Sequence, residues 1–231
     1  SPNDSAYIVL ASNDSSQPVG DYGTVLVIES NDSLTGAQYL PIELHVGTRL
    51  YAPTSIANRW NLLSIPVTPL TYVTTELFPD AISAAFAFAG GAYTVRDTLQ
   101  VGEGFWLKFD SSQQIVVSGY EIPEDTFEVA DDWNLVGSIT APVAVSSITS
   151  IPPGIVTSEF FGYNGAYLVS DTIQPGRAYW LKANQSGQIV ISSSSAASPA
   201  NRIRISPSGE SPPPPPNGDI TEVEEVPTSY G

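Results

Sequence analysis

The sequence predicts an all-β protein, because an internal repeat, short alternating apolar segments and a proline-rich end occur together. Ten of the 17 positions from Ala92 to Lys108 are identical in the stretch from Ala166 to Lys182. Between clusters of turn residues, apolar side chains alternate with polar ones, which is the pattern of strands. Residues 212–216 are all proline, and such a run favours an extended left-handed helix.

Residues 1–48 are predicted to form a partial β-sandwich. Apolar or β-branched runs occur at 7–11, 24–28 and 39–46, separated by turns that contain Asn-Asp-Ser. A complete sandwich needs about seven strands and about 100 residues. We therefore expect either that this half packs on the repeats or that another chain supplies the missing strands. Residues 49–58 are interpreted as a short linker.

The two repeats are predicted at 59–120 and 132–193. The first opens with Trp60-Asn61-Leu62 and the second with Trp133-Asn134-Leu135. Units of about 60 residues are small for an independent core, so we expect them to pack on each other with pseudo-twofold symmetry. An acidic connector, 121–131, separates them, and alternation at 125–129 indicates one more strand. The alanine-rich stretch Leu77–Phe88 is the best candidate for a short helix.

Residues 194–231 are interpreted as a Ser/Pro-rich tail. A tail of this composition orders only against another surface, and we expect a neighbouring copy to supply it. Apolar strands near the two ends are the candidates for exchange between subunits. The candidate assembly residues are Tyr7, Ile8, Val9, Leu10, Ile203 and Ile205.

Composition excludes several classes of partner. The formal net charge is −16, from 24 acidic and 8 basic residues, so neither nucleic acid nor an anionic membrane surface is an expected partner. No apolar run approaches the roughly 18 residues of a transmembrane segment. The densest acidic stretch, 121–132, is interpreted as a solvated surface, with weak Ca²⁺ binding as the sharper alternative.

The chain carries no recognisable catalytic, metal or cofactor site, and we predict that it is not an enzyme. It contains no cysteine and one histidine, His45, which lies in an alternating segment. A Ser-His-Asp set would need His45 as its base, and no nucleophile elbow or second histidine accompanies it. His45 is therefore interpreted as an ordinary strand residue.

The four tryptophans lie at equivalent positions of the two repeats and have two interpretations. They form the apolar core of each unit, or they form platforms on which sugar rings stack. Their aliphatic surroundings favour the core, because large aromatic side chains bury much area. The predicted core aromatics are Trp60, Trp106, Trp133 and Trp180.

Gly20-Asp21-Tyr22, Ser30-Asn31-Asp32 and Pro41-Ile42-Glu43-Leu44 resemble the last strands of an immunoglobulin-like domain. The repeats are similar to units that read Gly-Trp-Asn-Leu and later Pro-Gly-x-Gly-Tyr-Trp, although Arg59, Asp132 and Ala178 replace glycines of that pattern. In these motifs the chain resembles surface proteins exported by the type IX secretion system of Bacteroidetes. Residues 225–231 resemble the lead-in to a sorting domain. Short Asp-Ser or Asp-Thr motifs resemble O-glycosylation acceptors, at Ser5, Ser33, Thr98 and Thr172.

The resemblance implies export to the cell surface and carries over no catalytic residues. We therefore expect a non-catalytic extracellular structural protein that self-assembles into a filament or array through strand or tail exchange. The alternative is a glycan-binding or adhesive module of a larger surface protein. A third interpretation is a passive spacer from a large exported enzyme.

Overall fold

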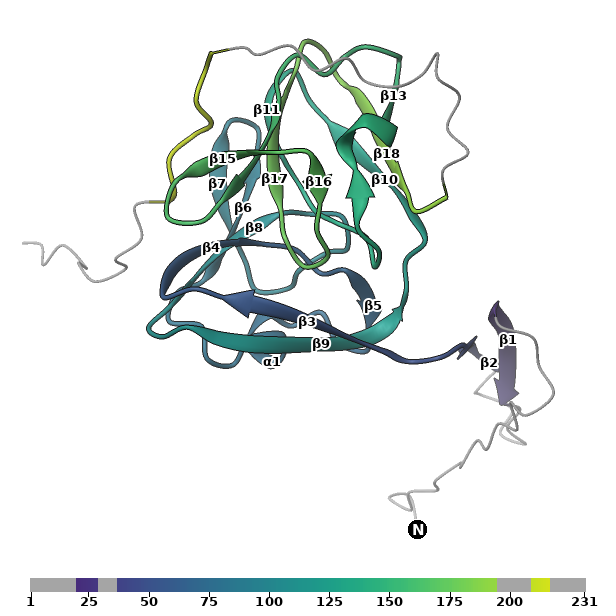
Figure 1. Ribbon diagram of the computed structural model, residues 1–231. Helices are drawn as coiled ribbons and strands as arrows, with labels where there is room; N and C mark the ends of the chain where they lie inside the picture. Colours follow the sequence, from purple (N-terminus) through teal and green to yellow (C-terminus); the bar gives the residue numbers. More distant parts are fainter. Residues whose placement is uncertain (1–19, 29–36, 195–208, 217–231) are drawn as a thin grey trace, which may run out of the picture. The chain divides into compact units, whose positions relative to one another are not determined.

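The protein separates into two compact units, Ser1–Thr48 and Arg49–Gly231, which are described in turn. The computed structural model describes residues 20–28, 37–194 and 209–216 (Figure 1). The candidate assembly residues named above, and the candidate acceptors Ser5 and Ser33, lie outside these ranges. Among the described residues nearly all regular structure is antiparallel sheet, so the all-β prediction is confirmed.

The first unit contributes one β-hairpin. Strand β1 (Gly20–Ile28) pairs antiparallel with β2 (Gln38–Val46), from Gly20↔Val46 to Ile28↔Gln38. The expected strands at 24–28 and 39–46 lie within it. A two-stranded hairpin has no second layer to bury its apolar side chains. Four of them are accordingly more than two-fifths exposed: Val25, Val27, Tyr39 and Leu40.

The first repeat of the second unit forms two sheets and one helical turn. One sheet has the order β3-β9-β5 and the other β4-β8-β6-β7. The strands are β3 (Leu50–Ile56), β4 (Arg59–Leu63), β5 (Val67–Pro69), β6 (Ala85–Ala89), β7 (Ala92–Arg96), β8 (Phe105–Phe109) and β9 (Gln113–Glu121), and the helix is α1 (Thr74–Leu77).

The second repeat follows the same plan. Its main sheets have the orders β10-β18-β13 and β11-β17-β14-β15, and β12 pairs with β16. The elements are β10 (Glu124–Val129), β11 (Asp132–Val136), β12 (Val143–Ala144), the 3₁₀ turn η1 (Val145–Ser147), β13 (Thr149–Ile151), β14 (Phe160–Tyr163), β15 (Tyr167–Ser170), β16 (Thr172–Ile173), β17 (Tyr179–Ala183) and β18 (Gly187–Ser192).

The observed strands bear on three sequence predictions. The stretch interpreted as a linker contains β3, which pairs with β9 along its whole length. The strand indicated by alternation at 125–129 is present as β10, which pairs with β18. The helix predicted at Leu77–Phe88 is wrong, because only Thr74–Leu77 is helical and Ala85–Ala89 is strand β6. Its Ala-Phe-Ala-Phe-Ala sequence alternates with period two, and this alternation outweighs the helix propensity of alanine.

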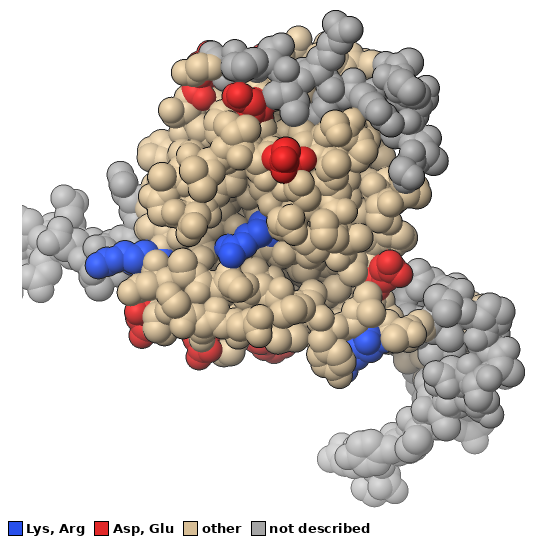
Figure 2. All heavy atoms as spheres, viewed as in Figure 1, with Lys and Arg blue, Asp and Glu red and all other residues tan. Residues whose placement is uncertain are grey.

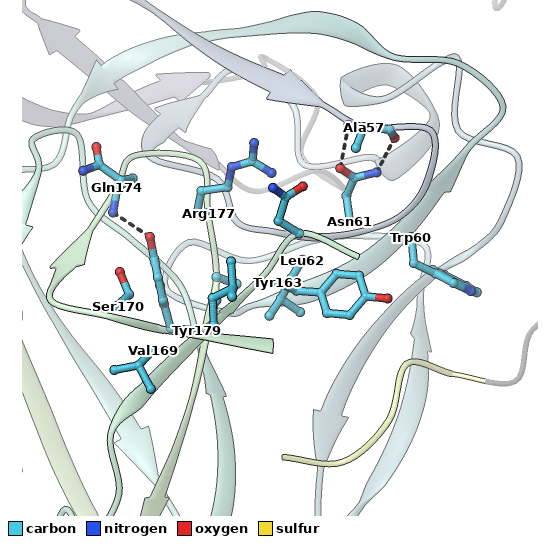
Figure 3. A pocket seen from close by; sticks show the side chains of 14 residues that line it. Ala57, Trp60, Asn61, Leu62, Tyr163, Val169, Ser170, Gln174, Arg177 and Tyr179 are labelled. Carbon is cyan, nitrogen blue, oxygen red and sulfur yellow. Dashed lines mark hydrogen bonds between the residues drawn. The ribbon is translucent and has the colours of Figure 1, made fainter. Parts of the chain in front are cut away.

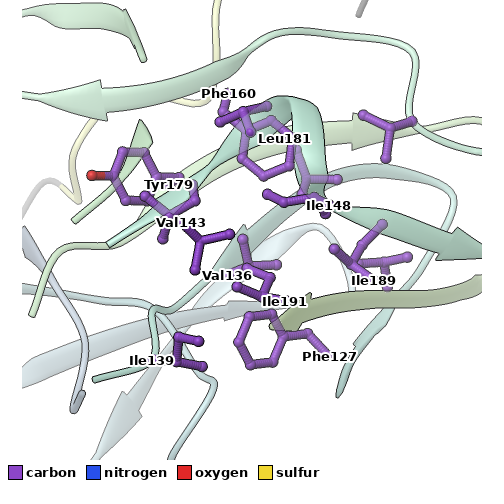
Figure 4. Close-up of a cluster of buried hydrophobic side chains, with 14 of the residues drawn as sticks. Phe127, Val136, Ile139, Val143, Ile148, Phe160, Tyr179, Leu181, Ile189 and Ile191 are labelled. Carbon is purple, nitrogen blue, oxygen red and sulfur yellow. The ribbon is translucent and has the colours of Figure 1, made fainter. Parts of the chain in front are cut away.

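Each repeat has its own core between its two sheets. In the second repeat, Phe127 and Ile189 from one sheet pack with Tyr179 and Leu181 from the other (Figure 4). In the first repeat, Phe105 and Leu107 take the equivalent places. Successive residues of a strand point to opposite faces, so Trp106 and Trp180 leave these cores and face the other side of their sheets. Both tryptophans are fully buried there, in a third cluster that the two repeats share.

The two repeats join through equivalent backbone contacts. The N–H of Ser64 donates to the carbonyl of Gly176 at 3.1 Å, and the N–H of Gly137 donates to that of Gly102 at 2.9 Å. Both glycines have φ values near +80°, which explains why this position of the repeat carries glycine. Beside these two backbone hydrogen bonds, the hydroxyls of Ser64 and Ser138 lie 2.8 Å apart and are buried. The joint is thus a hydrogen-bonded structure that fixes how the two tryptophan-bearing sheets face each other.

Candidate functional site: an aromatic seam that holds the proline segment

Two hairpins present matched aromatic pairs at the joint of the repeats. Phe88 faces Tyr93 across β6–β7, and Tyr163 faces Tyr167 across β14–β15. The ring centroids are 5.3 Å and 5.4 Å apart, both edge to face. We call these four side chains, with the buried Trp106 and Trp180 beneath them, the aromatic seam.

Each hairpin packs on the tryptophan of the other repeat. Phe88 of the first repeat contacts Trp180 of the second at 4.7 Å, and Tyr163 of the second contacts Trp106 of the first at 4.8 Å. The two more distant contacts, of Tyr93 with Trp180 and Tyr167 with Trp106, are both 6.4 Å. Edge-to-face contacts at these separations are favourable beyond simple burial. The seam therefore exists only when both repeats are folded and docked.

The polyproline run lies on this seam. The hydroxyl of Tyr93 donates to the carbonyl of Pro214 at 2.5 Å, and the hydroxyl of Tyr167 donates to the carbonyl of Pro213. Pro212 and Pro216 are buried, whereas Pro214 between them is exposed. In Figure 1 the segment runs in yellow beside β15 and β7. Two equivalent tyrosines thus donate hydrogen bonds to two successive proline carbonyls.

The chemistry of proline suits this contact. A proline residue has no N–H, so its backbone offers only an acceptor. A polyproline helix has no internal hydrogen bonds and leaves its carbonyls available. A surface that binds it must therefore supply donors and apolar area together. Tyrosine supplies both, from a ring that packs and a hydroxyl that donates.

Burial keeps the two hydroxyls protonated. Desolvation raises the pKa of Tyr93 from 10.0 to about 12. Desolvation also raises the pKa of Tyr167, and the nearby Tyr93 and Tyr163 add to the increase. The indole nitrogens of Trp106 and Trp180 make no hydrogen bond of their own among the described residues. Both tyrosines are therefore neutral donors over the whole physiological range of pH.

A lysine marks each end of the joint. Lys182 lies over the ring of Trp133 at 5.9 Å, and its equivalent, Lys108, lies over Trp60 at 5.8 Å. Lys182 also contacts Glu210, just before the polyproline run, and Asp132 at 3.3 Å. The hydrogen bond with Glu210 is the main reason that the pKa of Lys182 is raised. An ion pair thus fixes the start of the docked segment.

Two equivalent hollows flank the seam. One, of about 370 Å³, is lined by residues that include Trp60, Tyr163 and Arg177 (Figure 3). The other, of about 540 Å³, is lined by the equivalent Trp133 and Phe88, and also by Pro213 of the docked segment. The proline segment therefore borders one of two hollows that the repeats create.

Most polar groups of the first hollow are engaged within the protein. The amide of Asn61 bonds to the backbone of Ala57 in both directions, at 2.8 and 2.9 Å. The hydroxyl of Tyr179 accepts from the N–H of Gln174 at 2.9 Å (Figure 3). The guanidinium of Arg177 donates to the carbonyl of Ser55 at 2.5 Å. These groups support the fold, and few of them are directed at a ligand.

The residues singled out by the sequence differ in their burial and contacts. Trp106 and Trp180 have no exposed area, whereas Trp60 and Trp133 are half-buried at the edges of the shared cluster. Thr98 is exposed, and the half-buried Thr172 donates to Asp171 at 2.9 Å. His45 lies in β2, and its side chain lies outside the description.

Sequence analysis did not identify Tyr93 and Tyr167 as hydrogen-bond donors to the proline segment. It also expected a neighbouring copy to hold the polyproline run, whereas in the structure the run lies on the same chain. The available signal was that two repeat-equivalent tyrosines accompany a run that offers only acceptors.

The described part of the chain holds no group of three or more His, Cys, Asp or Glu side chains placed to bind a metal ion. None of its helices is long and apolar enough to cross a membrane. Acidic and basic side chains are few and scattered over the face shown in Figure 2. Comparison of the chain with protein-family models, with curated proteins and with solved structures finds no match.

Proposed function

We propose that the chain is a non-catalytic structural module of an extracellular bacterial surface, and that copies assemble into a filament or array by exchanging the proline segment or a strand. The observation that carries the proposal is the contact of Pro213 and Pro214 with Tyr167 and Tyr93. A segment that docks on its own repeats can dock equally on those of a neighbour, which is the principle of domain swapping.

The length of the connection allows such an exchange. Sixteen residues, 193–208, join the last strand to the docked segment. At no more than about 3.6 Å per residue, they reach at most about 58 Å. Within one chain, the same connection gives the segment a high effective concentration at the seam. Exchange is therefore favoured at high protein concentration, as on a crowded cell surface.

Two architectural features belong to the proposal. The reciprocal contacts at the joint support a pseudo-twofold relation between the repeats. The hairpin β1–β2, with exposed Val25 and Tyr39, is consistent with part of an immunoglobulin-like sandwich. Within the described part of the chain neither edge of this hairpin pairs with a further strand, and an unpaired edge offers a second route to assembly because it accepts a strand from another chain.

A complementation experiment tests the exchange. One full-length variant carries Tyr93→Ala and Tyr167→Ala, and the other carries serine at all five positions of 212–216. Each variant retains one half of the contact, so neither should self-assemble through the seam. When the two are mixed at high concentration, we expect complexes in which the intact tail of one occupies the intact seam of the other. Light scattering and negative-stain microscopy measure this, with the unmutated chain as reference.

Absence of mixed complexes, while the unmutated chain polymerises, would show that assembly uses another surface. Absence of polymers from the unmutated chain would remove the structural proposal itself. Truncation after residue 195 completes the series, since it should abolish polymers while the repeats stay folded.

The alternative function is glycan binding. The first hollow favours it, because Trp60 and Tyr163 line it beside the side chains of Asn164 and Arg177. Aromatic faces beside polar groups are a common feature of ligand sites. Quenching of tryptophan fluorescence by polysaccharides tests this, and loss of quenching in Trp60→Phe with retention in Trp133→Phe would assign it to this hollow.

A further inference from the structure

The seam is built from two equivalent halves, and the proline segment crosses both. The hydroxyl donors, Tyr93 and Tyr167, occupy the same position of the two repeats, as do the lysines at the ends, Lys108 and Lys182. The paired ring distances differ by no more than about 0.1 Å between the halves. A rotation that exchanges the repeats therefore returns nearly the same binding surface.

The docked ligand is almost as symmetric as the surface. A polyproline helix has about three residues per turn, identical side chains and carbonyls as its only backbone hydrogen-bonding groups. With its chain direction reversed, it presents a similar outline and a similar array of acceptors. Since the seam contacts two successive carbonyls, reversal exchanges the partners of Tyr93 and Tyr167 and leaves both contacts possible.

We propose that the seam is a general binding site for oligoproline in the polyproline conformation, that it accepts the ligand in either chain direction, and that it takes such segments from other chains. The ligand class is a run of about four or five prolines flanked by an acidic residue, as Glu210 beside Lys182 flanks the docked segment. This uses the same seam as the proposed function, but it needs no assembly and can hold for a monomer.

The two ends differ in one respect that sharpens the expectation. Lys182 has Asp132 within 3.3 Å, whereas the position equivalent to Asp132 in the first repeat is Arg59. The two ends of the seam therefore carry different charges, and we expect the two ligand directions to differ in affinity, by an amount that added salt reduces.

The test uses the full-length chain with serine at all five positions of 212–216, so that its own segment no longer competes. Isothermal titration measures binding of a synthetic peptide with the sequence of residues 209–216, and of a second peptide with that sequence reversed. A peptide with alanine in place of each proline is the control. Near-ultraviolet circular dichroism of the buried tryptophans checks that the variant is folded.

We expect both proline peptides to bind, with dissociation constants within about tenfold of each other, and the alanine peptide not to bind. Tyr93→Phe or Tyr167→Phe, added to the same variant, should weaken both peptides by about two- to tenfold, since each removes one hydrogen bond. Binding of the native direction alone would overturn the two-way site. Binding of neither peptide would overturn the site altogether.

A second measurement covers a variant that does not fold. In the unmutated chain, a millimolar peptide with the sequence of residues 211–216, which contains no glutamate, should displace the native segment and accelerate cleavage after Glu210 by a glutamate-specific protease. Mass spectrometry follows that cleavage, and an unchanged rate at saturating peptide counts against the site. The assembly experiment is independent: peptide binding without mixed complexes would refute tail exchange and leave this inference standing.

Discussion

The two repeats are alike where they meet and different where they do not. At the joint, both repeats carry a buried tryptophan, a pair of hairpin aromatics and a glycine (Gly102 or Gly176) whose carbonyl accepts a hydrogen bond from the other repeat. Their geometry is nearly equal in the two repeats. Away from it, the first repeat inserts helix α1 where the second has η1 and β13. The difference teaches that the shared surface restricts the sequence and that the outer segments only have to close each core.

The largest expected effect concerns the two buried tryptophans. We expect Trp106→Ala and Trp180→Ala to lower the free energy of unfolding by about 3–5 kcal/mol each, because each leaves a cavity in the shared cluster. Urea unfolding followed by circular dichroism measures it. The half-buried Trp133→Ala is the control and should cost less.

The comparison of the repeats gives this prediction a stricter form. If the repeats fold as one body, both unfold in a single transition, and each substitution lowers the urea concentration at its midpoint. Two separate transitions, with only one displaced by Trp106→Ala, would show that the repeats are independent and that the seam is a weak contact.

The second prediction concerns a position where the repeats cannot be identical. Gly104 and its equivalent Ala178 face each other, and a Cβ atom on Gly104 would lie 2.7 Å from that of Ala178 and 2.8 Å from Cγ of Leu135. Only one of the pair can therefore carry a methyl group. We expect Gly104→Ala to destabilise by about 1–3 kcal/mol, through overpacking.

The matched control is the exchange of the two residues. Ala178→Gly alone should cost about 0.5–1 kcal/mol, and the double variant should recover part of the loss caused by Gly104→Ala. Chemical unfolding of all four proteins gives the coupling energy. A value near zero would mean that the clash with Leu135, and not the facing pair, determines the cost.

The third prediction concerns the residues that open the tryptophan strands. Arg59 has a φ of 82° and Asp132 a φ of 78°, in the left-handed region that favours glycine. In both repeats the asparagine two positions later donates a hydrogen bond to the carbonyl of this residue. Asn61 donates to Arg59 at 3.0 Å, and Asn134 donates to Asp132 at 2.8 Å. This geometry favours glycine at both positions.

We expect Arg59→Gly to stabilise the protein by about 0.5–1 kcal/mol, because relief of the left-handed strain exceeds the added entropy of the unfolded chain. Asp132→Gly should gain less, since it also removes the contact with Lys182. Thermal unfolding measures both, and Asp110→Gly, at a position without positive φ, should not stabilise. Destabilisation by Arg59→Gly would show that its side chain contributes more than its backbone costs.

Much of the fold could be predicted from local pattern, and the site could not. The repeat, the strands and the burial of Trp106 and Trp180 follow from alternation and from the size of the side chains. Strand β3 was not expected within residues 49–58, because they lack strong apolar alternation and the strand forms through its pairing with β9. The docking of Pro213 on Tyr167 is a contact between segments 46 residues apart. No local pattern encodes such a contact.

The smallest expected effect on global stability comes from the ionisation of the two docked tyrosines, Tyr93 and Tyr167, at alkaline pH. Because the pKa of Tyr93 is raised from 10.0 to about 12, its folded form holds the proton more tightly than its unfolded form. Its contribution is therefore complete below pH 10 and is lost as the pH rises toward 12. Tyr167 should behave in the same way, since its pKa is also raised by burial. Tyrosinate absorbance during alkaline titration should show both ionising late, and Tyr93→Phe should remove one late step.

Serine at positions 212–216 separates the two sources of burial. If the proline segment is responsible, the late steps move toward the ordinary value. If they do not move, the shared cluster of the repeats buries these hydroxyls, and the segment only accepts their hydrogen bonds.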